Sequence, residues 1–525
     1  MQGVFKIAWA LFGVFVYSKM FSWELLPVVS VFLGFYCALS VILSDQIKSK
    51  ILKSFLAFFY VFLPGLSLGY LILDHAFFTP DMLDAVFQTS SSEAFEYCKQ
   101  FLDWSILVYL FFIGFLFFII KKMKTARTFP GRRKVIFILM ALAAIRFAPE
   151  TKLIYDSFLC YRRELYDYKE AIRARRIWNP PKAVTKAAND EIHVVVLGES
   201  LNRNHMSLYG YPRETTPQLD HQSDLLVFKD MISWHCYTED VLTRALTLAD
   251  VGHPLSYLRA PSIIELAKAA GFKTYWISNQ QEFAIGGSFT SVLASSADER
   301  YFMNHGLRMG KEDLGFKTAF FDEKLVEIFD KILTKDRNIS KPKILFIHLM
   351  GSHSLYKNRY PKEFCFFKYS EKDPIYAERN KTLKMDIMDQ YDNSIRYTDY
   401  VVGELIRKIS ETGLPATLTF MSDHGEDPQR NRGHNIKWLS KRLVEIPFLI
   451  WVSPAYRKQN PTAIEILKTA TQRPLENDTF DQFVFLLTRI ETPGRQIQYQ
   501  LSPANQGERP KRIVGKKYDY ESLPD

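Results

Sequence analysis

Cysteine is scarce in this chain, which has only five among its 525 residues. They are widely scattered, form no CxxC pair and show no regular spacing: Cys37, Cys98, Cys160, Cys236 and Cys365. Zinc ribbons and small disulfide frameworks need closely and regularly spaced cysteines. The cysteine pattern therefore argues against both kinds of structure.

A basic array suited to nucleic acid is also missing from the polar part of the chain. The formal net charge is +10, but no long run of Lys and Arg interleaved with aromatic residues occurs there. The densest basic run, Lys121 to Lys134, lies between two apolar segments. Such a position is typical of a cytoplasmic link in a membrane protein. We therefore expect a membrane-embedded protein without a nucleic-acid partner.

Long apolar runs, in contrast, fill the N-terminal part. Four of them approach the ~20 residues that a helix needs to cross a bilayer. They are Val4 to Phe21, Leu25 to Leu43, Phe55 to Leu73 and Trp104 to Ile120. A fifth, Val135 to Phe147, is shorter, and a buried soluble helix or an interfacial segment is the alternative interpretation. The first run lacks the small-residue cleavage site of a signal peptide, so we expect it to be retained.

The charges of the links favour five spans. Ser44 to Lys53 and Lys121 to Lys134 are basic and should be cytoplasmic, whereas Asp74 to Asp103 has six acids and one lysine and should lie opposite. Five spans place everything after about Ala148 outside, while four would leave the polar half in the cytoplasm. We predict a transmembrane domain of about five helices in residues 1–150, a juxtamembrane connector in 151–190 and an external domain in 191–525.

The predicted connector is rich in arginine. Its basic residues are Arg162, Arg163, Arg173, Arg175 and Arg176, among others. These side chains either meet phosphate headgroups or form a solvated face.

From Glu191 onward, short β-branched runs alternate with helical stretches. The runs are Ile192 to Leu197, Lys273 to Ser278, Ile344 to Leu349, Thr417 to Met421 and Phe448 to Val452. Helical stretches such as Ser262 to Ala270 and Asp392 to Ile409 separate them. This alternation indicates an α/β domain with a mostly parallel sheet flanked by helices on both faces.

Polar residues directly follow three of the predicted strands. Glu199 follows the first, His353 the third, and Asp423 and His424 the fourth. Because the chemistry of parallel sheets gathers at the carboxyl ends of their strands, we expect these side chains at one edge. His434 lies downstream in a Gly/Asn/Arg-rich loop that could fold back over that edge.

Carboxylate oxygens and an imidazole nitrogen together suit zinc, and a catalytic zinc keeps one position for a reacting group. Glu199, Asp423 and His424 supply three ligands. The fourth should be an oxygen nucleophile, and Thr238 is the candidate because it opens a predicted helix that runs to Ala249. A helix N-terminus favours phosphate, and zinc would lower the pKa of the threonine hydroxyl, which would then attack phosphorus.

Each of these residues also has an ordinary structural interpretation. Thr238 belongs to the preferred N-cap residues, the carboxylates could cap helices or pair with arginines, and the histidines could be loop residues. Ser200 is an alternative nucleophile beside Glu199. It does not lie in a G-x-S-x-G elbow, because Asn202 stands where the second glycine belongs.

Two motifs carry a resemblance to a known family. Val194 to Ser200 and Met206 to Pro217, which contains Gly-Tyr-Pro-Arg-Glu-Thr, strongly resemble phosphoethanolamine transferases of the alkaline phosphatase and sulfatase superfamily. The likeness continues through Ala245 to Asp250, Trp276 to Gln281 and Ser422 to Glu426, and it covers nearly the whole chain. Within the family, the chain most resembles the CptA-type enzymes, which act on the heptose of the lipopolysaccharide core.

The resemblance implies a role for each candidate residue. Thr238 is the implied nucleophile, the implied zinc ligands are Glu199, Thr238, Asp423 and His424, and the implied phosphate or second-metal residues are His353 and His434. Thr238 would take phosphoethanolamine from phosphatidylethanolamine, releasing diacylglycerol, and a sugar hydroxyl of core heptose or lipid A would then take it from the enzyme. The family also implies a multi-pass protein of the bacterial inner membrane with a periplasmic catalytic domain.

Departures from the family pattern limit this inference. Sulfatases mature a cysteine or serine in a C-x-P-S-R type motif, which Tyr237 to Asp240 does not offer, so sulfate ester hydrolysis is disfavoured. The cysteines do not match the disulfides of lipid A-directed relatives, and the loop Asp427 to Arg432 is short, which leaves the acceptor open. The alternatives are a membrane-bound phosphoglycerol transferase or phosphodiesterase with the same site, and a non-catalytic membrane scaffold.

Overall fold

The computed structural model of the protein describes residues 181–249, 260–281, 289–304, 320–368, 385–429, 436–493, 511–515 and 517–525, with single positions between 159 and 175 and at 501. The chain divides into two units between Leu165 and Tyr166, and every element described below belongs to the second. The five predicted spans, in residues 1–150, lie outside the described residues. In the described ranges, no helix combines the length and the apolar character that a bilayer crossing requires.

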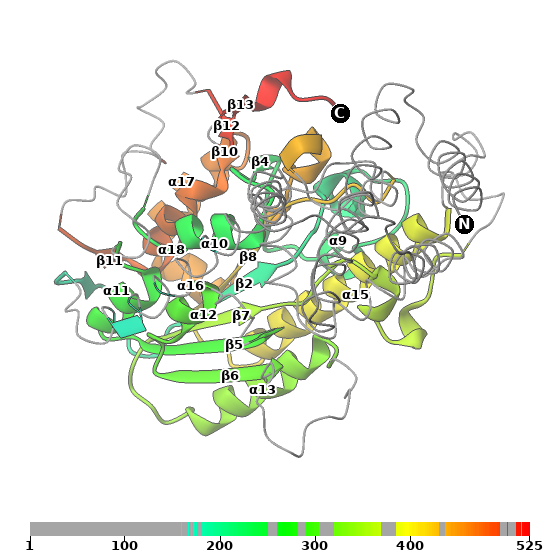
Figure 1. Cartoon of the computed structure of the whole chain (residues 1–525). Helices are drawn as coiled ribbons and strands as arrows, with labels where there is room; N and C mark the ends of the chain where they lie inside the picture. The colour runs from blue at the N-terminus through cyan, green and yellow to red at the C-terminus, as the bar shows by residue number, and fades with distance from the viewer. Residues whose placement is uncertain are drawn as a thin grey trace, which may run out of the picture. The chain divides into compact units, whose positions relative to one another are not determined.

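A seven-stranded sheet forms the centre of the second unit (Figure 1). In spatial order its strands are β3 (Leu225–Phe228), β9 (Phe448–Val452), β8 (Ala416–Ser422), β2 (Ile192–Gly198), β7 (Lys343–His348), β5 (Lys273–Gln281) and β6 (Glu299–Asn304). The five strands from β8 to β6 are mutually parallel, and β9 runs antiparallel to both of its neighbours. The prediction of a mostly parallel sheet is confirmed.

Two strands of this sheet were not predicted. β3 and β6 lie at its two edges, where one side of a strand has no neighbour. Three of the four residues of β3 are only partly buried, and β6 begins with Glu299 and Arg300. β3 therefore offers a run of only four apolar residues and β6 a run of only three, and both runs are shorter than the stretches that marked the predicted strands.

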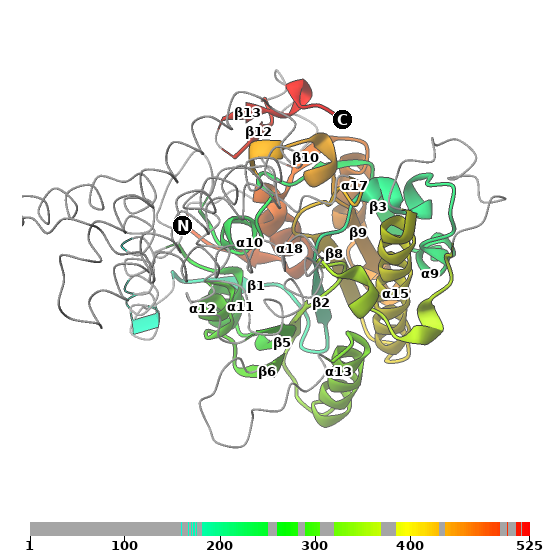
Figure 2. The ribbon, with the colours of Figure 1, turned by 45° about the vertical axis from the view of Figure 1, so that its right-hand side comes forward.

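Helices cover both faces of the sheet (Figure 2). One face carries α10 (Thr238–Ala245), α11 (Ile263–Ala269), α12 (Phe289–Ala294), α16 (Pro454–Gln459), α17 (Pro461–Ala470) and α18 (Phe480–Thr488). The other carries α9 (Pro217–Asp220), α13 (Glu323–Lys335) and α15 (Met385–Ser410). The predicted helices correspond to α10, α11 and α15.

The central strands feed both cores. In β2, Val195 and Leu197 join one apolar cluster, whereas Val194 and Val196 join the other. All seven residues of the strand are buried. Successive side chains of a strand point to opposite faces, so a strand covered on both faces is mostly apolar, as the sequence pattern indicated. His193 is the one polar side chain of β2, and it is also buried.

Three small strand pairs lie outside the main sheet. β4 (Asp230–Ile232) runs parallel to β10 (Pro474–Glu476), β1 (Val184–Thr185) antiparallel to β11 (Ile490–Glu491), and β12 (Ile513–Val514) antiparallel to β13 (Tyr518–Asp519). The pair β4–β10 matters for function, because β4 leads into the segment before α10.

One connector arginine contradicts both expectations for that region. The guanidinium of Arg175 donates to Glu265 at 2.6 Å and to the carbonyl oxygen of Ala260 at 3.2 Å. Its side chain is only 5% exposed, so it contacts neither solvent nor headgroups. The connector is thus joined to α11 by a buried ion pair, whereas Arg173 forms an exposed pair with Glu170.

Candidate active site

Neighbouring strands bring the predicted residues to one edge of the sheet. β2 lies between β8 and β7, and its last residue, Gly198, pairs with Ser422 at the end of β8. Glu199 therefore follows β2 directly beside Asp423 and His424, which follow β8. Because β2 and β8 run parallel, the three residues that follow them lie at the same end of the strand pair.

These three side chains form a compact group of potential ligands. One ligand atom from each of Glu199, Asp423 and His424 lies within 4.8 Å of the others. Nε2 of His424 is 3.4 Å from Oε1 of Glu199 and 3.6 Å from Oδ2 of Asp423. All three residues are buried. Two carboxylates and one imidazole in this arrangement match the donor set of a catalytic metal site.

Two further observations fit a bound cation. Oδ2 of Asp423 is buried and accepts no hydrogen bond from any residue that the structure describes. Nδ1 of His424 lies 2.7 Å from the carbonyl oxygen of Gly425. Because a carbonyl can only accept, Nδ1 carries a proton, and Nε2 is the ring nitrogen that can bind a metal ion.

Burial and neighbouring charges shift the pKa values of these groups. Burial and the charge of Glu199 raise the pKa of Asp423 to about 6. Burial also disfavours ionised Glu199, but hydrogen bonding to His424 and its charge outweigh burial and lower the pKa of Glu199. Burial disfavours protonated His424, yet Asp423 and Glu199 raise its pKa to about 10. Two carboxylates here share one positive charge, and a divalent cation would stabilise both as anions.

Thr238 lies beside this group. It is the first residue of α10, and its hydroxyl donates to Oε2 of Glu199 at 3.3 Å. Tyr237 occupies the N-cap position, so the interpretation of Thr238 as a capping residue is wrong. Thr238 is only partly buried, whereas the three potential ligands are buried. Thr238 is therefore less enclosed than the three potential ligands.

Comparison with known proteins identifies the family. The model of the sulfatase family matches residues 192–481, from the start of β2 to α18. The chain is also 30% identical over 435 residues to phosphoethanolamine transferase EptC of Escherichia coli O18:K1:H7, covering 75% of this chain and 73% of that protein. The chain belongs to the sulfatase family, among its phosphoethanolamine transferases.

A second relative and a solved structure agree. The transferase is 27% identical over 439 residues to phosphoethanolamine transferase CptA of Salmonella typhimurium, with 75% and 73% coverage. It superposes on the C-terminal periplasmic domain of Escherichia coli EptC, crystallised in complex with Zn, with a TM-score of 0.58 and 28% identity. The match covers 66% of this chain and 98% of that domain. The predicted resemblance and enzyme class are confirmed.

Ser200, the alternative nucleophile, has a different place in the transferase. Its hydroxyl donates to Oε1 of Glu199 at 2.7 Å, and its N–H donates to Oδ1 of Asp423 at 3.0 Å. The residue is fully buried. Ser200 is thus more enclosed than Thr238, although the hydroxyl of each residue donates to Glu199.

The two remaining predicted residues differ in what the structure describes. His353 follows β7 at the same edge, and its charge contributes to the lowered pKa of Glu199, but it is not part of the three-residue ligand group. Its loop packs against Glu199: Gly351 has φ +53, and a Cβ there would lie 2.8 Å from the Glu199 carbonyl oxygen. His434 lies outside the described residues.

Two residues near the site were missed. His348 ends β7, where burial lowers its pKa to about 4 against the attraction of Glu199. The sequence did offer a signal for His348, because it is a polar residue near the end of an apolar run. Asn477, fully buried, accepts from the N–H of Trp234 at 3.0 Å and donates to the carbonyl oxygen of Asp423 at 3.1 Å. It thereby joins the segment before Thr238 to the end of β8, and no local pattern marks it.

Proposed function

We propose that the transferase uses Zn²⁺ and Thr238 to move phosphoethanolamine from phosphatidylethanolamine to a lipopolysaccharide sugar, on core heptose or lipid A. The observation that carries the proposal is the hydroxyl of Thr238, 3.3 Å from a carboxylate that belongs to a buried three-residue ligand group. The zinc complex of a relative's periplasmic domain supports the choice of metal.

In the proposed site, Glu199, Asp423 and His424 would hold the metal ion, and Thr238 lies beside Glu199. Zinc, when bound, supplies positive charge that lowers the pKa of a nearby hydroxyl. The oxygen of Thr238 forms a bond to phosphorus while the bond from phosphorus to the diacylglycerol oxygen breaks. The proton lost by the threonine is balanced by the proton that the diacylglycerol oxygen gains. The acceptor hydroxyl then displaces Thr238 from phosphorus and restores it.

The start of α10 favours the same reaction. The first N–H groups of a helix have no partner within the helix, and the helix dipole is positive at that end. A phosphate approaching Thr238 therefore meets the end of the helix that stabilises negative charge. His353, and His434 in the loop downstream, are the proposed residues for holding the phosphate or a second metal ion.

The proposal includes a membrane location. A lipid donor requires the catalytic domain, residues 191–525, to work at a membrane surface, and the apolar runs of residues 1–150 provide about five spans. The basic links place this domain on the periplasmic side of a bacterial inner membrane. The domain of Escherichia coli EptC that superposes on this fold is named as periplasmic.

Labelled donor lipid tests the proposal. The full chain in detergent is incubated with phosphatidylethanolamine labelled in its ethanolamine, and the modified residue is located by mass spectrometry. We expect label on Thr238, release of diacylglycerol, and loss of both in Thr238→Ala. The first test of the acceptor is to supply lipopolysaccharide with and without its core heptose.

Ser200→Ala is the matched control, since it also removes one hydroxyl beside Glu199. This variant should still become labelled at Thr238, although more slowly, because Ser200 contacts both proposed carboxylate ligands. Labelling that survives in Thr238→Ala but disappears in Ser200→Ala would reassign the nucleophile.

A further inference from the structure

Ser200 has an unusual backbone conformation between two of the proposed ligands. Its φ of +58 lies in the left-handed region, which residues with a side chain rarely adopt. In this conformation its hydroxyl binds Glu199 and its N–H binds Asp423. One residue thus contacts both carboxylates, and the direction of each contact depends on the conformation of Ser200. Such strain persists only where the surroundings hold it.

Tyr391 of α15 supplies one such restraint, on the carbonyl side of Ser200, while the hydroxyl of Ser422 accepts from the N–H of Leu201 at 2.9 Å. The hydroxyl of Tyr391 donates to the carbonyl oxygen of Ser200 at 2.8 Å and accepts from the N–H of Asn202 at 2.9 Å. The side chain is fully buried, so water does not replace either bond. The hydroxyl oxygen of Tyr391 therefore contacts both the carbonyl group of Ser200 and the N–H of Asn202, two residues further along the chain.

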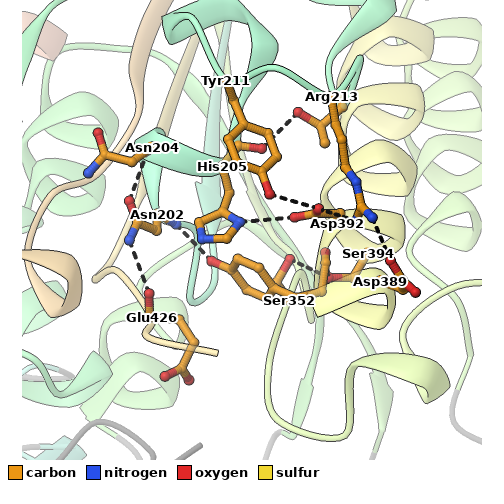
Figure 3. Close-up of polar contacts among 12 residues, drawn as sticks. Asn202, Asn204, His205, Tyr211, Arg213, Ser352, Asp389, Asp392, Ser394 and Glu426 are labelled. Atoms are coloured by element: carbon orange, nitrogen blue, oxygen red, sulfur yellow. Dashed lines mark hydrogen bonds and ion pairs between the residues drawn. The ribbon is translucent and has the colours of Figure 1, made fainter. Parts of the chain in front are cut away.

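A buried ionic network fixes α15 to the same stretch of chain (Figure 3). The carboxylate of Asp392 accepts from Nδ1 of His205 at 2.9 Å, from the hydroxyl of Tyr211 at 2.9 Å and from Nη1 of Arg213 at 2.7 Å. Nη2 of Arg213 donates to Asp389 at 2.7 Å. The helix that carries Tyr391 is thus anchored to the residues that follow Asn202, and Tyr391 acts from a rigid support.

We propose that Tyr391 is a positioning residue for the metal site. Its hydroxyl keeps Ser200 left-handed and so fixes where Glu199 and Asp423 present their oxygens. This inference rests on the proposed metal site. Without the hydroxyl of Tyr391, the backbone of Ser200 relaxes toward negative φ, and the peptide group after Glu199 rotates. The carboxylates of Glu199 and Asp423 then no longer point toward the same metal position.

A matched control is needed to distinguish this positioning role from a purely structural role of Tyr391, and α15 itself contains one. Tyr397 is also buried, and its hydroxyl accepts from the N–H of Glu323 at 3.1 Å, at the start of α13. Replacement by Phe removes one buried hydroxyl in either case and keeps the ring. Of these two tyrosines, only Tyr391 forms hydrogen bonds with the backbone that follows Glu199.

The experiment measures zinc affinity rather than turnover. The full chain in detergent is stripped of metal, and zinc is titrated in competition with a chromophoric chelator, with thermal unfolding of the metal-free protein recorded alongside. Tyr391→Phe should weaken zinc binding by roughly 10- to 100-fold, as loss of a residue that orients a ligand does. Tyr397→Phe should bind zinc like the wild type, although both variants lower the melting temperature.

A second background tests whether Tyr391 acts through Ser200. Glycine adopts positive φ without steric cost, so Ser200→Gly needs no restraint to hold that conformation. In this background, Tyr391→Phe should weaken zinc binding much less than in the wild type, giving a non-additive cycle. If Tyr391→Phe alone does not fold, the inference predicts that adding Ser200→Gly restores folding and zinc binding, and failure of this rescue would overturn it.

The outcomes are distinguishable. Equal zinc affinities for Tyr391→Phe and Tyr397→Phe, or an additive cycle, would overturn the inference while leaving the proposed function standing. A wild-type protein that binds no zinc would overturn the metal site, and the inference with it.

Discussion

Three buried aspartates of the transferase show how the surroundings of a carboxylate decide its role. Asp392 accepts from a histidine, a tyrosine and an arginine, so both of its carboxylate oxygens are hydrogen-bonded. Asp423 keeps one oxygen without a hydrogen bond from the described residues, which suits a cation. Among the described residues, the hydrogen-bond donors to Asp399 are the backbone N–H groups of Gln218 and Leu219 at the start of α9. Identical side chains thus serve as an anchor, a potential metal ligand and a helix cap.

Asp399 leads to a prediction about pH. Burial raises its pKa from 3.8 to about 7, although hydrogen bonds from the N–H groups of Gln218 and Leu219 lower it. Between these two values the folded state holds a proton that the unfolded state has lost, so stability falls as pH rises. The slope from this group is roughly 1.4 kcal/mol per pH unit at most. Asp399→Asn should flatten the decline, measured as urea unfolding from pH 4 to 8.

Asp298 provides the control for this measurement. Burial opposes its ionisation, but the Lys268 ammonium and hydrogen bonds from Thr274 lower its pKa, so its stabilising charge is lost only toward acid pH. Asp298→Asn should therefore shift stability without flattening the profile between pH 4 and 8. A wild-type slope that survives in Asp399→Asn would contradict the assignment.

Among the elements, α15 has the most connections to the site. Besides Tyr391, its Ser394 donates to Ser352 at 2.8 Å, in the loop that carries His353. The helix thus contacts the loops after β2 and after β7. The Gly-Tyr-Pro-Arg-Glu-Thr motif, which carried the family resemblance, contributes Tyr211 and Arg213 to its anchor. The motif therefore has a structural explanation that does not require contact with substrate.

The anchor predicts a large loss of stability in Arg213→Gln. The guanidinium of Arg213 pairs with Asp389 and Asp392, and the three side chains are almost completely buried. Removing one partner of a buried ion pair leaves uncompensated charge and costs about 3–5 kcal/mol. Urea unfolding of the metal-free protein measures the loss.

Arg407→Gln is the comparison on the same helix. Arg407 pairs with Glu404 and Glu411 on the exposed side of α15, where solvent screens the charges. Its replacement should leave the unfolding curve nearly unchanged. Similar curves for the two variants would show that the buried network does not anchor α15.

For the catalytic unit as a whole, the metal ion should be part of the fold. A ligand that binds only the folded state stabilises it, by about 2.7 kcal/mol when its concentration is 100 times its dissociation constant. We therefore expect chelation to lower the melting temperature and added zinc to restore it. Glu199→Ala is the control, because it lacks a proposed ligand and should not respond to zinc. A wild-type melting temperature indifferent to zinc would contradict a site formed by Glu199, Asp423 and His424.

Much of the fold could be predicted where burial is complete. β2, β7 and β8 are buried along their whole length, so their residues are mainly apolar or β-branched, and their limits fall close to the predicted ones. The reversed direction of β9 could not be predicted, because an apolar run has the same composition in either direction. β3 and β6 escaped because edge strands are not buried on all sides.

The amino-acid sequence was sufficient for the local features of the site: which polar residues end which strands, that a threonine begins a helix, and the family. Which of these residues meet depends on strand order, since Glu199 and Asp423 are adjacent only because β2 pairs with β8. The tasks of Ser200, Tyr391 and Asn477 likewise became visible only in three dimensions. Hydrophobic periodicity reports the burial of each segment, but it carries no information about which distant segment lies beside it.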